Sequence, residues 1–179
     1  SLSLSLSLSL SLSLSLSQVV VSQPEEPQRW LVEARQIFPD GRSRARGSPL
    51  SEKMLSKETP IVAARRGVLE ELGPALRRRG ARRRGDHERR RESMSGEQIE
   101  IDGSSLTQWR ETRHSHSYPS LLSHYNLHQF EASIRGLPSD AFSTVESDGG
   151  RKLVHIWQWE EGSRSRSSCA FQDLASVWI

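Results

Sequence analysis

The sequence predicts an α/β fold in which strands surround one short helix. Five segments have the apolar runs or the apolar–polar alternation of strands, whereas residues 59–73 repeat apolar side chains at helical spacing. The strand segments are residues 18–22, 29–38, 97–101, 125–134 and 152–159. Residues 18–179 are long enough to form a single domain with a modest core.

Residues 1–17 are a strict Ser–Leu alternation. A period of two would suit a strand with one apolar face, but a CT dinucleotide repeat in DNA encodes the same dipeptide. The segment has no initiator methionine, basic leader or small-residue cleavage site, so it does not resemble a signal peptide. Its high serine content argues against a membrane span. We therefore expect this low-complexity repeat to lie outside the fold.

The next two strand segments lead toward the helix. Residues 18–22 form a short apolar run, and residues 29–38 are rich in β-branched and aromatic side chains. The sequence Pro39-Asp40-Gly41 predicts a turn, because proline presets φ and glycine accepts a positive φ. Residues 42–49 are expected to form a basic loop.

Start and stop signals delimit the helix. Thr59 supplies a hydroxyl for the free N–H groups of the first turn, where Pro60 needs no N–H. Gly73 and Pro74 predict its end. One face carries an apolar stripe formed by Ile61, Ala64, Val68 and Leu72. The opposite side is expected to carry Arg66, Glu70 and Glu71.

This helix and the residues before it resemble the Nudix box. The pattern of that family is G-x5-E-x7-R-E-U-x-E-E-x-G-U, where U is a bulky aliphatic residue. Six of the nine fixed positions match, with both gaps at the right length: Glu58, Arg66, Val68, Glu70, Glu71 and Gly73. Three positions depart, with Glu52 at the first glycine, Gly67 at the glutamate after Arg66, and Pro74 at the last aliphatic residue.

The resemblance implies a Nudix-like α/β/α sandwich with a mixed sheet. It also implies a Mg²⁺- or Mn²⁺-dependent pyrophosphohydrolase of nucleoside diphosphates linked to another moiety. Glu70 and Glu71 would hold the metal, and the expected catalytic residues are Glu58, Arg66 and Glu70. Adjacent carboxylates are costly to keep ionised without a cation, and bound Mg²⁺ can bridge phosphate oxygens and activate water. In the alternative interpretation, the same residues are a solvated helix face with an i,i+4 ion pair.

Gly67 separates two hypotheses about function. In the family, the glutamate at this position binds metal or acts as a base, so its replacement predicts weakened or lost hydrolysis. Glycine inside a helix also costs about 1 kcal/mol relative to alanine. The first hypothesis is a Nudix-type hydrolase, and the second is a catalytically inactive Nudix-fold module that binds a nucleotide or a protein.

Residues 77–92 are the strongest break in composition. Nine arginines against three acidic residues give this segment a net charge of +6, whereas the whole chain carries +3. Because like charges repel and little apolar area is available, we expect a disordered insert. A weaker functional alternative is that the insert grips the phosphates of nucleic acid. No aromatic residue interrupts it, so base stacking within the insert is not expected.

The remaining segments offer weaker signals. Residues 104–124 are polar and predict a long surface loop, and a second helical layer is expected within residues 104–123 and 171–179 or is absent. Four histidines have spacings seen in metal sites, but without nearby cysteines or clustered carboxylates they are expected at surface or strand positions: His114, His116, His124 and His128.

Two further sets of residues are candidates for the site. In Nudix-type proteins another acidic residue often completes the metal shell, and the candidates are Glu100, Glu111 and Glu131. Trp157 or Trp159 is a candidate for stacking on a nucleobase, although aromatic residues on a strand are more often core. Cys169 is the only cysteine, which excludes an intramolecular disulfide and favours an intracellular location. The expected partner is a nucleoside diphosphate derivative, without membrane contact.

Overall fold

The computed structural model of the chain describes residues 11–76, 98–114, 121–148 and 151–162 as a mixed α/β structure dominated by one sheet. The first four strands are β1 (Ser11–Gln23), β2 (Glu26–Ile37), β3 (Ser43–Ser48) and β4 (Leu50–Lys53). The last four strands are β5 (Ile99–His114), β6 (Leu122–Ile134), β7 (Phe142–Asp148) and β8 (Arg151–Glu161). Between β4 and β5, helix α1 (Pro60–Gly67) continues through the π-helical turn η1 (Val68–Leu72).

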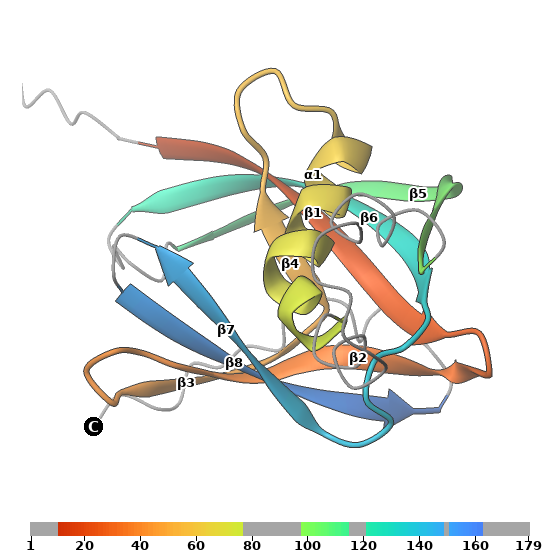
Figure 1. Cartoon of the computed structure of the whole chain (residues 1–179). Helices are drawn as coiled ribbons and strands as arrows, with labels where there is room; N and C mark the ends of the chain where they lie inside the picture. Colours follow the sequence, from red (N-terminus) through yellow and green to blue (C-terminus); the bar gives the residue numbers. More distant parts are fainter. Residues whose placement is uncertain (1–10, 77–97, 115–120, 149–150, 163–179) are drawn as a thin grey trace, which may run out of the picture.

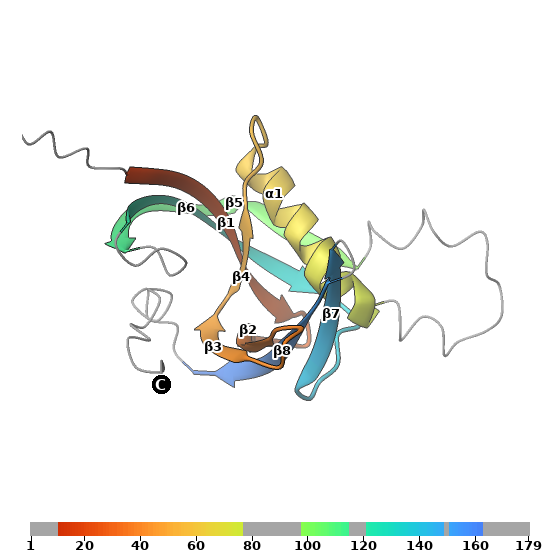
Figure 2. The ribbon, with the colours of Figure 1, turned by 90° about the vertical axis from the view of Figure 1, so that its left-hand side faces the viewer.

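The sheet is mixed and open. Its main strand order is β5-β6-β1-β2-β8-β7, while β3 pairs with β2 and β4 pairs with β1. Strands β1 and β6 are parallel, and the other described pairs are antiparallel. The helix lies against one side of the sheet and extends from β1 and β6 toward β7 (Figures 1 and 2). No second helical layer is present among the described residues, so that part of the predicted sandwich is not found there.

The core forms between the helix and the sheet. Three of the four predicted stripe residues are buried there, namely Ala64, Val68 and Leu72, whereas Ile61 is 37% exposed. They join residues of six strands and the loop after β6, including Val19, Leu31, Leu50, Ile99, Ile134, Leu137 and Trp157. Amphipathic helical spacing therefore predicted the buried face over most of the helix.

The helix begins as predicted but continues beyond its expected end. Thr59 has the extended backbone of an N-cap and Pro60 is the first helical residue, although the Thr59 hydroxyl makes no capping hydrogen bond. Residues 73–76 remain helical, and Gly73 has φ −51° and ψ −38°. Ala75 and Leu76 are buried in the core, so packing outweighs the local stop signal of Gly73 and Pro74.

Part of the Ser–Leu repeat belongs to the fold. Residues 11–17 form the first half of β1, which pairs with β6 on one side and with β4 on the other. Leu16 is 7% exposed and packs with Tyr125 and Leu127. The expectation that residues 1–17 lie outside the fold is therefore wrong for residues 11–17, because a period of two suits a strand that finds partners on both edges. Residues 1–10 lie outside the described residues.

Replacing Leu16 tests this assignment. Leu16→Ala removes a buried side chain from the Tyr125–Leu127 cluster and is expected to lower the free energy of unfolding by about 2–3 kcal/mol. Leu55→Ala is the control, because Leu55 is 62% exposed and its loss should change stability by less than about 0.5 kcal/mol. Urea denaturation measures both values. Equal stability of the two variants would show that the repeat does not contribute to the core.

Other predicted strands are found, and two predicted loops are not. The predicted strands within β1, β2, β6 and β8 are confirmed, as is the start of β5. The expected basic loop at residues 42–49 contains β3, and the expected loop at residues 104–124 contains most of β5 and the start of β6. Strand β5 lies at the end of the main strand order, and most of its residues are exposed. Its sequence is therefore polar and was predicted to be a loop. The Arg-rich segment 77–92 and residues 171–179 lie outside the described residues. No helix in the described ranges has the length and apolar character needed to cross a membrane.

Candidate active site

Arg66 is the centre of one charged cluster, which we call the Arg66 cluster: Arg66, Glu52, Glu58 and Glu70. The guanidinium binds both carboxylate oxygens of Glu58, with Nε and Nη2 each at 3.0 Å. Nη1 lies 2.9 Å from Glu52 Oε1 and 3.2 Å from Glu70 Oε2. Nη2 also donates to the carbonyl of Lys53 at 2.7 Å. Arg66 therefore ties the helix to β4 and to the loop between them.

Electrostatics hold this cluster in its charged form. The hydrogen bond from Arg66 lowers the pKa of Glu58, and the Leu55 backbone N–H lowers it further. The same pair with Glu58 is the largest cause that raises the pKa of Arg66 above its usual range. The structure thus brings together the three predicted catalytic residues Glu58, Arg66 and Glu70. Three carboxylates around one guanidinium leave the cluster with a negative charge.

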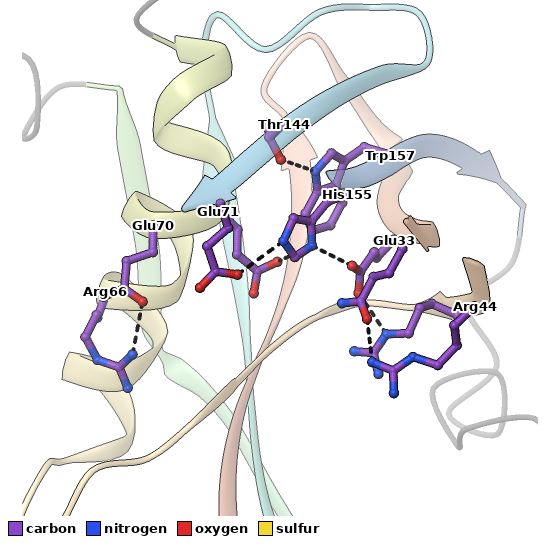
Figure 3. Close-up of polar contacts among 11 residues, drawn as sticks. Glu33, Arg44, Arg66, Glu70, Glu71, Thr144, His155 and Trp157 are labelled. Carbon is purple, nitrogen blue, oxygen red and sulfur yellow. Dashed lines mark hydrogen bonds and ion pairs between the residues drawn. The ribbon is translucent and has the colours of Figure 1, made fainter. Parts of the chain in front are cut away.

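A second group lies buried between the helix and the sheet, and we call it the inner group: Glu33, Glu71 and His155. One ligand atom from each residue lies within 4.8 Å of the others, so these side chains could hold a metal ion. They come from β2, η1 and β8. Figure 3 shows His155 between Glu71 and Glu33, with Arg66 and Glu70 farther along the helix.

Pairing of β2 with β8 places Glu33 beside His155. Glu33 is opposite Trp157, and Gln36 is opposite His155, with a β-bulge between Glu33 and Arg35. A bulge adds one residue to a strand and changes which side chains turn inward. Both Glu33 and His155 consequently face the core, where they are 1% and 2% exposed.

Glu33 is a fully compensated carboxylate. Its Oε1 accepts from His155 Nδ1 at 2.6 Å, and its Oε2 accepts from Arg46 Nε at 2.8 Å. Burial alone would raise the pKa of Glu33, but the His155 hydrogen bond and the Arg46 charge outweigh it and lower the pKa. Glu33 is therefore ionised and acts only as an acceptor, so His155 Nδ1 carries the proton between them.

His155 is held on its other sides as well. Its Nε2 lies 3.3 Å from Glu146 Oε2 on β7. Its ring stacks on Trp157, with centroids 6.0 Å apart and planes 14° from parallel. Trp157 in turn donates from Nε1 to the Thr144 hydroxyl at 2.8 Å. The imidazole is thus fixed in position by β2, β7 and its own strand.

Glu71 is the member of the inner group whose carboxylate accepts no hydrogen bond from the described residues. Its side chain is 9% exposed, and its Oε2 lies 3.8 Å from His155 Nδ1. Burial raises the pKa of Glu71 well above its ordinary value, and the charges of Glu33 and Glu52 raise it further. A cation among these oxygens would compensate the charge of the ionised carboxylate.

The two predicted metal ligands do not share a face of the helix. Glu70 is exposed and pairs with Arg66, whereas Glu71 is buried and turns toward the sheet. Glu71 follows Val68 by three residues, a spacing that places both side chains on the same side of a helix. The prediction that Glu71 lies with Arg66 and Glu70 on the outer face is therefore wrong.

Sequence reasoning missed the residues that accompany Glu71. Glu33 and His155 lie beside Glu71, and Glu146 lies beside His155. The predicted acidic candidates lie on β5 and β6, outside the inner group: Glu100, Glu111 and Glu131. The available signal was a charged or polar residue within an otherwise apolar strand: Glu33 follows Trp30-Leu31-Val32, and His155 follows Leu153-Val154. Such residues need a partner when the strand is buried.

The aromatic and histidine candidates have structural roles where they are described. Trp157 has no exposed surface, so the expectation that a strand tryptophan is more often core is confirmed for it and it is no longer a candidate for stacking on a base. Trp159 donates from Nε1 to the Pro138 carbonyl at 2.9 Å, and Arg29 lies over its ring. His114, His124 and His128 lie on β5 and β6, as expected, and none belongs to the inner group. His116 lies outside the described residues.

No protein-family model, curated protein or solved structure matches this chain.

Proposed function

We propose that the chain is a Mg²⁺- or Mn²⁺-dependent hydrolase that cleaves the pyrophosphate linkage of nucleoside diphosphates attached to another moiety. The observation that carries this proposal is Glu71, a buried carboxylate that faces Glu33 and His155 without a hydrogen bond from the described residues. Burying such a group is costly unless a cation or a proton compensates its charge. The Nudix-like spacing that contains Glu71 supports phosphate chemistry as the use of that cation.

The donor set fits a hard or borderline divalent cation. Carboxylate oxygens suit Mg²⁺ and Mn²⁺. When bound, the ion would polarise a phosphoryl oxygen and lower the pKa of a water molecule. Glu71 and Glu33 would provide oxygen ligands. The Nδ1 proton of His155 orients the Glu33 carboxylate.

The Arg66 cluster would position the rest of the site. Glu58 holds the guanidinium of Arg66 in place by two hydrogen bonds, and this restricts where the exposed Glu70 can lie. Glu70 is the carboxylate nearest solvent in this cluster, with a side chain 48% exposed. It is therefore the residue of the predicted catalytic set best able to reach a bound phosphate or its attacking water.

Hydrolysis of a substrate panel tests the proposal. The purified chain is incubated with nucleoside diphosphate sugars, dinucleoside polyphosphates and nucleoside triphosphates, with Mg²⁺, with Mn²⁺ or with a chelator. We expect at least one substrate to be cut at a P–O–P linkage only when a divalent cation is present. The proposal is contradicted if no substrate is cleaved and no divalent cation raises the melting temperature of the chain.

The second candidate function is binding without catalysis. Gly67 favours it, because no side chain is present where the Nudix pattern has glutamate. This candidate predicts that a nucleotide raises the melting temperature while no product forms with either metal. Nucleic-acid binding through residues 77–92 is a weaker proposal, which predicts salt-dependent binding that disappears when those residues are deleted.

A further inference from the structure

Two of the three departures from the Nudix pattern, Glu52 and Gly67, contact each other in the structure. Glu52 lies on β4 and Gly67 is the last residue of α1. A Cβ atom added to Gly67 would lie 2.8 Å from Glu52 Cβ and 3.1 Å from Leu50 Cδ2. Because Glu52 Cβ is attached directly to the backbone, it cannot move aside without moving β4. Glycine at residue 67 is therefore what allows a side chain at residue 52 in this packing.

The side chain of Glu52 reaches toward the candidate site. Its Oε1 lies 2.9 Å from Arg66 Nη1, and the side chain is 22% exposed. Gly67, on which an added Cβ would meet Glu52 Cβ, is buried one helical turn before the buried Glu71, so Glu52 and Glu71 lie on the same side of the helix. Glu52 thus lies where the Arg66 cluster approaches Glu71.

Arg66 does not depend on Glu52 alone. The guanidinium keeps two hydrogen bonds to Glu58, one to the Lys53 carbonyl and one to Glu70. The Glu52 carboxylate can therefore turn from Arg66 to another cation while Arg66 stays in place. Together with the buried Glu71, it offers oxygen ligands from two different elements.

We propose that residues 52 and 67 form a reciprocal exchange. Glu52 on β4 supplies a carboxylate to the divalent-cation site, and Gly67, which has no side chain, leaves the space that the Glu52 side chain occupies. The inference rests on the proposed function, because it assigns Glu52 to the same cation as Glu71. It explains both departures at once: a glutamate at residue 67 and a glutamate at residue 52 cannot occupy this contact together.

Manganese binding tests the chemical half of the inference. The affinity of the metal-free chain for Mn²⁺ is measured without substrate by the paramagnetic resonance signal of free Mn²⁺. Glu52→Gln keeps the shape of the side chain and is expected to weaken binding about 10-fold or more. Glu25→Gln in the exposed turn between β1 and β2 is the control and should bind as the parent does. Unchanged affinity of Glu52→Gln would overturn the assignment.

Melting temperatures of the metal-free protein test the steric half. Gly67→Glu alone should lower the melting temperature by about 2–10 °C through overpacking against Glu52. Glu52→Gly with Gly67→Glu should recover most of that loss, and it should bind Mn²⁺ more tightly than Glu52→Gly alone. Additive losses in the double variant would overturn the exchange, because residues in contact are expected to be non-additive.

The two proposals can fail separately. A parent chain that binds no Mn²⁺ contradicts the proposed cation-dependent function and the ligand role of Glu52 together. A parent that binds Mn²⁺ while Glu52→Gln binds it equally well contradicts only the inference about Glu52.

Discussion

Glu71→Gln is expected to reduce cation-dependent hydrolysis about 100-fold and, at the same time, to raise the melting temperature of the metal-free protein. The two effects have one cause. Glu71 is buried without a hydrogen bond from the described residues, and burial raises its pKa well above the ordinary value. The ionised carboxylate can bind a cation, but it lowers the stability of the fold when no metal is bound. Glutamine removes the charge and keeps the volume, so we expect a gain of about 1 kcal/mol, or roughly 2–4 °C.

The pH dependence of this gain follows from the direction of the pKa shift. A carboxyl group whose pKa is raised by folding stabilises the fold below its unfolded pKa of 4.5, and this contribution is lost as the pH rises toward the folded pKa. The advantage of Glu71→Gln should therefore be largest above neutral pH and should shrink as the pH falls toward 4.5.

Thermal unfolding with and without Mn²⁺ measures this prediction. The parent, Glu71→Gln and the control Glu25→Gln are compared at several pH values, alongside rates on whichever substrate the panel identifies. Mn²⁺ should raise the melting temperature of the parent and of the control but not that of Glu71→Gln. A Glu71→Gln protein that melts lower than the parent at pH 8, or that keeps full activity, would contradict the role given to Glu71.

Local spacing predicted the Arg66 cluster because its members are close in sequence. Glu58 and Glu70 lie eight and four residues from Arg66, so one helix start and one helical turn bring them together. Patterns of this length are visible in a single sequence. The same holds for β6 and β8, whose alternation extends over whole strands.

The inner group could not be predicted in the same way. Glu33 and His155 are 122 residues apart, and their contact requires the pairing of β2 with β8 and the bulge after Glu33. Glu71 belongs to the Nudix-like pattern, but its burial depends on how the helix packs on the sheet. The polar edge strand β5 and the Ser–Leu half of β1 could not be predicted from the sequence either. Their structure depends on pairing with neighbouring strands more than on their own composition.

Glu33→Gln is expected to have the opposite effect on stability from Glu71→Gln, although both residues belong to the inner group. Glu33 is 1% exposed and binds both His155 and Arg46, so loss of its charge breaks a buried ion-pair network. Removing one partner of such a pair typically costs about 3–5 kcal/mol, and we expect a loss in this range at pH 7.5. Urea denaturation measures it, with Glu160→Gln on the exposed face of β8 as the control.

The pH dependence of the Glu33 effect also has the opposite sign. The pKa of Glu33 is lowered in the fold, so its stabilising contribution is present above the unfolded pKa of 4.5 and is lost as the pH falls through the folded pKa. The stability difference between parent and Glu33→Gln should therefore narrow in acid, where the Glu71→Gln difference also vanishes. If both substitutions stabilise the metal-free protein at pH 7.5, Arg46 and His155 do not compensate Glu33. If both destabilise it, Glu71 has a partner of its own, and a cation is no longer needed to account for its burial.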